Sequence, residues 1–480
     1  MTRPAAPAQE APRRDGRLRR ALRLGILEGG AATVSVVLLS GAFLTGYALL
    51  IGASDIHLGV LGAIPMVAGL PGLLGAWLAE RLRSRRRVVT TMALAGRTLW
   101  LSLLFIPSLP LPQEARVWTF VALFGLAALI QGAISTPWMS WMSDLAPARL
   151  RGRFWARRNQ FIAVVNMGVL LGGGCLIDGA EALGHKLWGY YLLVLVAYAS
   201  GLASIRLLRR THEPPMKPAP GGGFLANARR PLRDQTFRRL IPAVATFQLG
   251  LGLAAAFVSA YMLKTLELSY TAIGLYTILG QLAGIAGNWF WGPMLDRVGV
   301  KPVTLCSLLF VGIVPFLWVS CDWLGWPMIV FNWLFSGFAW AGFGLGMVNF
   351  PFALSPRDGR SYYLSVLGIL GGGAFLVGSL VGGLYAEWLG PGRVRVVGLD
   401  VVNYQVLLVA SGVVRLSSYL LFARVRDARG GGIGAVIEHM VSLFYLRMIA
   451  WTRPGAGLPL EAPGGDDVPT STRTTASPSR

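Results

Sequence analysis

Residues 292–301 read Gly-Pro-Met-Leu-Asp-Arg-Val-Gly-Val-Lys, a short charged stretch between two long apolar runs. A related stretch, Ala-Trp-Leu-Ala-Glu-Arg, occupies residues 76–81 and also closes an apolar run. Both stretches place an acidic residue directly before an arginine at the point where the run ends. A pattern that recurs at a long separation is typical of a duplicated chain, so the two stretches indicate related halves.

Two more landmarks recur in the same order. Pro147 followed by Arg-Gly-Arg at 151–153 matches Pro356 followed by Gly-Arg at 359–360, and Ala-Ser-Gly at 199–201 matches Ala-Ser-Gly at 410–412. Equivalent positions lie about 207 to 216 residues apart throughout. Three matches in one order are difficult to obtain without duplication, and the sequence therefore predicts two homologous halves.

The apolar residues gather into runs long enough to cross a membrane. The 480-residue chain is 54% hydrophobic and only 14% charged, which does not suit a water-solvated surface. A helix needs roughly 20 apolar residues to cross a hydrocarbon core. About twelve runs qualify: residues 24–52, 58–79, 88–108, 117–142, 155–177, 187–207, 238–263, 270–291, 302–320, 325–352, 362–388 and 401–423. The predicted fold is an all-α integral membrane protein with twelve transmembrane helices in two pseudo-symmetric bundles of six.

Arginine is unevenly distributed between the loops. Arg-rich connections follow alternate runs and include residues 81–87, 149–158 and 209–239, whereas residues 53–57 and 178–186 contain no Arg. Loops rich in Lys and Arg stay on the cytosolic side, so we expect a multi-pass protein of the bacterial inner membrane with both termini in the cytosol. Topology then explains the net charge of +22, and we expect no nucleic-acid partner.

Composition also predicts how the chain is divided. Several prolines and glycines among arginines at 208–237 predict a solvated linker between the halves. Apolar residues at helical spacing after the last run predict an amphipathic helix on the membrane surface. The predicted segments are a basic cytosolic tail (1–23), a first six-helix bundle (24–207), a cytosolic linker (208–237), a second six-helix bundle (238–425), an interfacial helix (426–453) and a disordered tail (454–480).

The stretch that begins at Gly292 has the pattern Gly-x-x-x-Asp-Arg-x-Gly-x-Lys. Together with the duplicated twelve-run pattern, it resembles the signature loop of the major facilitator superfamily. The first-half copy departs from that pattern, with Ala76, Glu80 and Arg83 in place of glycine, aspartate and glycine. The resemblance covers about residues 24–425. It implies a transporter in which spans one, four, seven and ten line a central path and spans two, five, eight and eleven gate it.

The acidic residues of these loops are candidates for a conformational latch. A carboxylate at the end of a helix faces the negative pole of its own dipole, so Asp296 needs an arginine or the start of another helix. Span eleven offers Asp296 a helix start and the nearby Arg360. Span five offers Glu80 a helix start and nearby arginines. Such a contact exists in one of two conformations and biases their equilibrium. The alternative is that the charges only cap helices and fix topology. The latch residues are Glu80, Arg81, Arg153, Gly292, Asp296, Arg297, Gly299, Lys301 and Arg360.

Two sets of polar residues lie within the runs. Ionisable residues are costly in lipid and usually face a bundle interior. We expect Arg97 and Arg415 to pair with carbonyls or polar neighbours, or else to attract anions, and Glu28 to cap a helix or to couple protons. The second set combines amides and indoles, which suit a neutral or amphipathic solute, although any single member is more often a helix-packing residue. This substrate-path set is Gln131, Trp138, Asn166, Gln248, Gln281, Asn332 and Trp340.

Small residues recur one turn apart in two of the gating spans. Gly168-x-x-x-Gly172 lies in span five, and Gly378-x-x-x-Gly382 lies in span eleven. This spacing predicts close backbone approach, either where gating helices slide or as static packing.

The leading function class is secondary active or facilitative transport of a small solute by alternating access. The alternative is a lipid flippase or a non-transporting membrane scaffold on the same fold. We do not expect an enzyme, because the four histidines stand apart in the sequence and no phosphate loop or metal-ligand spacing occurs. We expect no cofactor and no metal, a small-molecule substrate, contact with the lipid bilayer, and a monomer.

Overall fold

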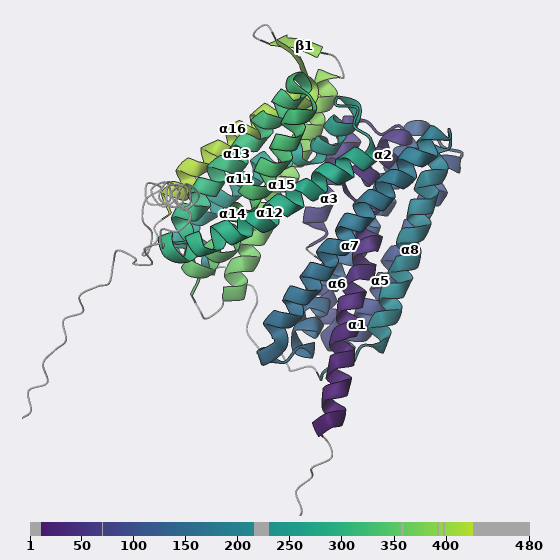
Figure 1. Ribbon diagram of the computed structural model, residues 1–480, viewed down its shortest axis with the longest axis vertical. Coiled ribbons are helices and arrows are strands. Elements are labelled where there is room, and N and C mark those ends of the chain that lie inside the picture. Colours follow the sequence, from purple (N-terminus) through teal and green to yellow (C-terminus); the bar gives the residue numbers. More distant parts are fainter. Residues whose placement is uncertain are drawn as a thin grey trace, which may run out of the picture.

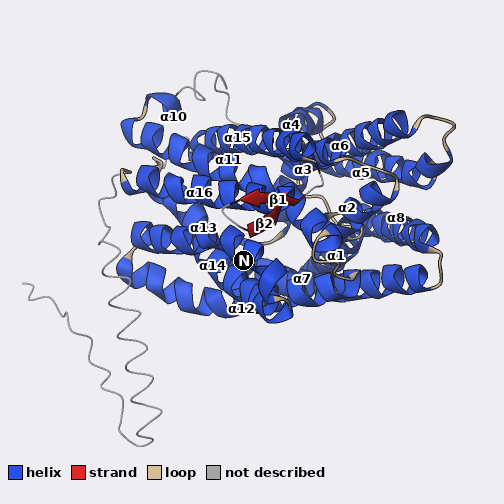
Figure 2. Ribbon diagram, turned by 90° about the horizontal axis from the view of Figure 1, so that it is seen from above, coloured by secondary structure: helices blue, strands red, loops and turns tan. Residues whose placement is uncertain are grey.

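The computed structural model describes residues 11–69, 71–215, 230–356, 360–390, 393–396 and 399–425. Figure 1 shows two bundles of long helices, one from each half of the chain. Seen from above in Figure 2, the bundles lie side by side. The architecture is the predicted pair of helical bundles.

The first half comprises the six predicted spans. They correspond in order to α1 (Ala11–Val37) with α2 (Gly41–Leu50), α3 (Asp55–Val67) with α4 (Gly72–Arg81), α5 (Arg85–Trp100) with the short 3₁₀ turns η1 (Leu101–Leu104) and η2 (Ile106–Ser108), α6 (Gln113–Leu145), α7 (Ala148–Ala182) and α8 (Lys186–Arg210). The break between α3 and α4 follows from Pro65 and Pro71, because proline lacks the N–H that continues a helix.

The second half repeats the pattern after a one-turn helix. Its elements are α10 (Arg230–Arg233), α11 (Gln235–Lys264), α12 (Tyr270–Val298), α13 (Val300–Leu324), α14 (Trp326–Leu354), α15 (Arg360–Leu389) and α16 (Asn403–Ala423). An antiparallel hairpin of β1 (Arg393–Val396) and β2 (Leu399–Val402) connects the last two helices. Within the described residues, nine helical segments are individually long and apolar enough to span a membrane.

Some segment boundaries differ from the sequence expectation. Helix α1 begins at Ala11, inside the expected tail, because its arginines are good helix formers. Residues 208–210 belong to α8, and α10 lies within the expected linker. The expected interfacial helix at 426–453 and the tail at 454–480 lie outside the described residues.

Helix packing shows the duplication directly. In the first half, α1 packs against α7 and α8, and α6 packs against α5 and α4. In the second half, α11 packs against α15 and α16, and α14 packs against α13 and α12. Equivalent spans therefore have equivalent neighbours, which confirms the two pseudo-symmetric bundles.

The main contacts between the halves are also a symmetric pair, α3 with α15 and α7 with α12. We call the end that carries residues 51–54, 183–185 and 265–269 the Arg-poor end, and the opposite end, which carries residues 82–84 and 146–147, the Arg-rich end. Figure 1 shows the bundles meeting toward the Arg-poor end, beside α2 and β1, and diverging toward the end where α1 begins.

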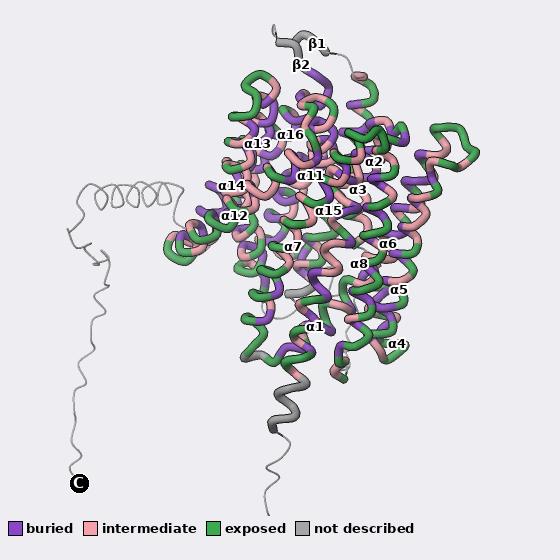
Figure 3. The backbone as a smooth tube through the Cα atoms, turned by 45° about the vertical axis from the view of Figure 1, so that its right-hand side comes forward, coloured by how far each residue is buried: buried purple, intermediate pink, exposed green. Residues whose placement is uncertain are grey.

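Large apolar side chains cover the outside of both bundles. Trp289 is 79% exposed and Trp388 is 78% exposed. In Figure 3, exposed residues recur along the outer helices. Such a surface fits contact with lipid rather than water.

The two glycine pairs behave differently. A Cβ at Gly378 or Gly382 would overlap the carbonyl oxygen of Leu249 or Leu253 on α11, so this pair permits the predicted close approach. A Cβ at Gly168 or Gly172 would meet open space. Spacing alone predicted close approach at both pairs, and it was wrong for span five because that face of α7 has no helix against it at those positions.

Two of the intramembrane charges belong to a buried network in the first half. Glu28 on α1 is 3% exposed, and its carboxylate lies 3.4 Å from Arg158 on α7. Ser204 on α8 donates to the same carboxylate at 3.2 Å. Arg97 on α5 donates to the Gly201 carbonyl and, at 3.3 Å, to the Ser204 hydroxyl. Arg97 thus has the carbonyl and polar partners of the first sequence interpretation, and the network joins four helices through Glu28 and Ser204.

Arg415 has a different environment. It is 4% exposed on α16, where its backbone and side chain pack against Gly250 of α11. Its Nε is buried and has no hydrogen-bond partner in the described part of the chain. The sequence expected a polar partner here, and the structure does not supply one to this atom.

Glu28→Gln tests the network. The substitution leaves the buried Arg158 guanidinium without its carboxylate, so we expect a loss of about 3–5 kcal/mol of stability. The matched control is Glu80→Gln, which neutralises an exposed carboxylate. Thermal unfolding of the purified proteins should show a much lower midpoint for Glu28→Gln only. Equal midpoints for the two variants would contradict the network.

Candidate functional site

A cavity at mid-depth is lined almost entirely by the second half. It has a volume of about 450 Å³ and lies between α12 and α14, with Ala163 of α7 at its edge. Its polar side chains come from α12 (Thr277, Gln281 and Asn288) and from α14 (Ser336). Trp333 and Trp340 supply indole rings. No ionisable residue lines this cavity among the described residues.

Three residues of the predicted substrate path meet at this place. Gln281 and Trp340 line the cavity. The Asn166 amide of α7 donates to the Gln281 side-chain oxygen at 3.2 Å, so this hydrogen bond joins the two halves. Trp340 also contacts Phe247 of α11, with ring centroids 6.2 Å apart. The amide pair and the indole therefore lie where α7, α11, α12 and α14 converge.

The other four members lie at separate helix contacts. Gln131 packs against Gly96 of α5, and Gln248 packs near Gly371 of α15. The Trp138 ring lies under the Arg158 guanidinium, 4.7 Å from its centroid. Asn332 is fully buried, and its side-chain oxygen and nitrogen have no hydrogen-bond partner in the described chain. The structure does not bring all seven residues into one site.

Sequence reasoning missed Thr277, Asn288, Ser336 and Trp333. The signal was present in their spacing. Thr277, Gln281 and Asn288 follow one another at intervals of one and two helical turns, which places them on one face of α12. Thr277 and Asn288 could therefore be predicted from the face that they share with Gln281.

The signature loops lie at the Arg-rich end and perform visible structural roles. Gly299 has a φ of 103° and ends α12, a backbone conformation that glycine adopts without a Cβ penalty. Lys301 donates to the Ala423 carbonyl at 2.9 Å and so caps the end of α16. The Arg81 guanidinium lies 5.3 Å from the Trp77 ring centroid.

The acidic latch candidates are not engaged in this conformation. The side-chain carboxylates of Asp296 and Glu80 form no hydrogen bond or ion pair with another described residue. The remaining latch residues lie on the same end: Gly292 and Arg297 on α12, Arg153 exposed on α7, and Arg360 at the first position of α15. The loops of the two halves are therefore separate here, as expected at the end where the bundles diverge.

Polar contacts between the halves concentrate instead at the Arg-poor end. Asp178 of α7 accepts from the backbone N–H groups of Tyr270 and Thr271 at 2.9 and 2.8 Å. Across the molecule, Glu387 of α15 accepts from the Ile56 N–H at 3.2 Å. Sequence reasoning assigned Asp178 to a loop and gave Glu387 no role.

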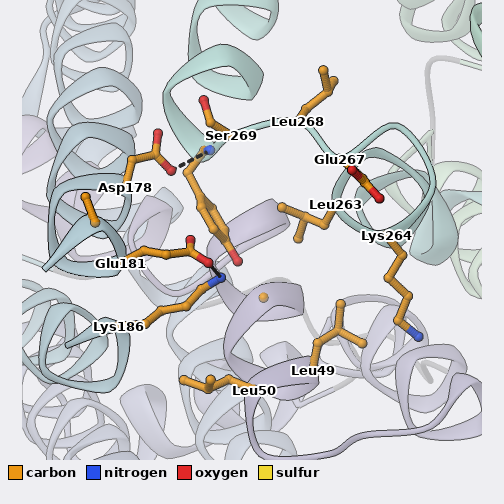
Figure 4. Close-up of a pocket in the computed structure, with 13 residues that line it drawn as sticks. Leu49, Leu50, Asp178, Glu181, Lys186, Leu263, Lys264, Glu267, Leu268 and Ser269 are labelled. Atoms are coloured by element: carbon orange, nitrogen blue, oxygen red, sulfur yellow. Dashed lines mark hydrogen bonds and ion pairs between the residues drawn. The ribbon is translucent and has the colours of Figure 1, made fainter. Parts of the chain in front are cut away.

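A pocket of about 680 Å³ lies at this end, between residues of both halves. Figure 4 shows Asp178 beside the start of α12 and Glu181 paired with Lys186. Beneath them, the Tyr190 hydroxyl donates to the Tyr270 hydroxyl at 2.7 Å. These contacts close the Arg-poor end above the mid-depth cavity.

Comparison with known proteins gives a family match for the second half of the chain. The model of the Major Facilitator Superfamily matches residues 240–451, which contain most of the second bundle. No curated protein sequence matches the chain.

Solved transporters share the fold along most of the chain. A variant of the nucleoside transporter NupG is similar with a TM-score of 0.64 and 14% identity, over 85% of this chain and all of that one. A bacterial homologue of the iron transporter ferroportin in the inward-facing state gives a TM-score of 0.63 at 17% identity, over 85% of this chain and 98% of that one. A D-xylose-proton symporter gives a TM-score of 0.62 at 16% identity, over 86% of this chain and 98% of that one. The second bundle matches the model of the Major Facilitator Superfamily, and the fold of the whole chain is similar to that of these solved transporters.

Proposed function

We propose that the protein carries a small, neutral, hydrogen-bonding solute across the bacterial inner membrane by alternating access. The observation that carries this proposal is the Asn166–Gln281 hydrogen bond, because it joins the first half to a residue that lines the cavity. A solute bound there contacts both bundles, so its binding changes the relative energies of their arrangements.

The cavity chemistry supports a neutral solute. Amide groups donate and accept hydrogen bonds, hydroxyls do the same, and indoles offer flat apolar faces. A charged solute would need a counter-charge at this depth, and the described lining has none. The volume of about 450 Å³ is within the range of pockets that hold small molecules.

The arrangement of contacts supports alternating access. Polar contacts join the halves at the Arg-poor end, while the side-chain carboxylates of Asp296 and Glu80 at the Arg-rich end have no described partner. By the distribution of Arg, the Arg-rich end faces the cytosol. This conformation is then the inward-open one, and Asp296 would reach the start of α15 only when the cytosolic end closes.

Substitution of the amide pair tests the solute site. A thermal-shift screen of neutral metabolites should first supply a ligand, because a molecule that binds the folded protein raises its stability. Asn166→Ala or Gln281→Ala each removes one hydrogen-bonding side chain, so we expect binding of that ligand to weaken about 2- to 12-fold.

Gln131→Ala is the matched control, since Gln131 packs against α5 away from the cavity. Calorimetry should give it the native affinity. Equal losses in all three variants, or a set of ligands consisting only of anions, would overturn the solute site.

Asp296→Asn tests the cytosolic latch. Loss of the charge removes an interaction with a helix start that is worth about 0.3–2 kcal/mol, so saturable uptake into proteoliposomes should slow about 2- to 30-fold while the protein stays folded. Glu267→Gln, at the opposite end, should transport normally. Unchanged uptake by Asp296→Asn would remove the latch. Lipid movement without any saturable solute uptake would favour the flippase alternative.

A further inference from the structure

The closed Arg-poor end contains a duplicated sequence element. Gly174-x-x-x-Asp178 lies in the last turns of α7, and Gly383-x-x-x-Glu387 lies in the last turns of α15. The two copies are 209 positions apart, within the separation of the other repeated landmarks. Each element contains a glycine followed one turn later by a carboxylate, in the span that gates its own half.

The helices that receive these carboxylates are duplicates as well. Helix α12 begins after the N-cap Ser269, and α3 begins after the N-cap Ser54, 215 positions earlier. Asp178 accepts from the N–H groups of Tyr270 and Thr271, and Glu387 accepts from that of Ile56. Thr271 and Ile56 are both the second residue of their helix. Each contact joins one half to the other.

The glycines set the distance at which the helices meet. A Cβ on Gly174 would lie 2.8 Å from the Cα and N atoms of Thr271. A Cβ on Gly383 would lie 3.2 Å from the Asp55 carbonyl oxygen and from the Gly59 Cα. The first turn of the receiving helix therefore lies directly against the glycine in both copies, and the carboxylate one turn later reaches its free N–H groups.

The electrostatics of this arrangement favour contact between the halves. The first N–H groups of a helix have no partner within the helix and carry partial positive charge. A carboxylate in the last turn of its own helix faces partial negative charge, so it gains from any helix start that comes within reach. Both groups are satisfied together only when the two halves are closed at this end.

The first side chain of each receiving helix adds a second contact across the halves. Tyr270 stacks on Phe43 with ring centroids 6.2 Å apart and bonds to Tyr190, both in the first half. Asp55 accepts from the Tyr404 hydroxyl and, at 3.1 Å, from the Asn403 amide in the second half. Figure 4 shows the Asp178 side of this closure, with the carboxylate directed at the start of α12.

We propose that the two Gly-x-x-x-acid elements form a duplicated latch at the external entrance. Both copies must open before a solute can enter from outside. The inference rests on the proposed alternating access. Asp178 and Glu387 lie at the external ends of spans five and eleven. Each pairs a carboxylate with a helix start, as expected for the signature loops at the cytosolic ends of spans two and eight.

Spin-label distances measure the latch without a substrate. Leu183 and Leu324 are exposed positions at the Arg-poor end, one in each half. Spin labels on cysteines at these positions report the opening of that end by double electron–electron resonance spectroscopy. The three native cysteines, Cys175, Cys306 and Cys321, are free and would be replaced. Asp178→Asn should raise the population at the long distance relative to that at the short distance about tenfold. The more exposed Glu387→Gln should raise it about threefold. The double variant should combine the two factors.

Two matched controls separate the latch from general effects of substitution. Glu181→Gln neutralises a carboxylate at the same end that pairs within its own half, so it should leave the distances unchanged. Gly174→Ala should open the end, whereas Gly172→Ala, with open space around its Cβ, should not. Gel filtration and thermal unfolding establish that each variant is folded.

The latch is overturned if the folded double variant has the native distance distribution, or if Glu181→Gln opens the end as much as Asp178→Asn does. Failure of the proposed function gives a different result. In that case the distances respond as expected, but no neutral solute binds the cavity or is taken up.

Discussion

A chain in lipid has no water with which to satisfy its backbone, so every N–H and C=O within the membrane must find a partner in the protein. Long helices solve this along their length and leave only their ends unsatisfied. In this protein the ends are where the two bundles exchange polar contacts. The first turns of α3 and α12 receive carboxylates from the opposite half. Motion between the bundles therefore changes a few bonds at helix ends and leaves the helix interiors intact.

The rigid parts are held together by a different kind of contact. In the first half, one buried carboxylate, Glu28, connects α1, α7 and α8, and Arg97 of α5 joins it through Ser204. In the second half, Gly378 and Gly382 allow α15 to lie against the backbone of α11. Such contacts are expensive to break, because they leave an unpaired charge or an open gap. The gate contacts are more exposed and less costly, which suits contacts that open and close.

Sequence alone predicted the spans, the duplication and the family resemblance, because each is recognised from short stretches without knowing which helices are in contact. It did not predict which side of a helix faces the cavity. A membrane helix such as α12 is apolar on its lipid side and on its protein side, so hydrophobic periodicity does not point to the interior. Of the seven predicted path residues, Asn166, Gln281 and Trp340 lie together, whereas Asn332 is buried at another helix contact.

The sequence also did not predict which distant spans pair, because periodicity does not show which side of a membrane helix faces another helix. Arg97 and Glu28 were recognised as unusual, yet their shared partner Ser204 lies on a third helix. Asp178 and Glu387 read as ordinary residues beside loops, since only the packing of α7 on α12 and of α15 on α3 gives them a helix start to meet. Their common spacing from Gly174 and Gly383 becomes meaningful once those helices are seen in contact.

A disulfide across the Arg-poor end tests alternating access most directly. The Thr271 hydroxyl lies 3.7 Å from the Cys175 sulfur in the other half, so Thr271→Cys places two thiols in contact. Oxidation should keep that end closed, preserve solute binding from the cytosolic side and abolish saturable uptake into proteoliposomes, and reduction should restore uptake. With Cys175→Ser added, oxidation should have no effect. Full uptake while the disulfide is intact would contradict alternating access in this protein.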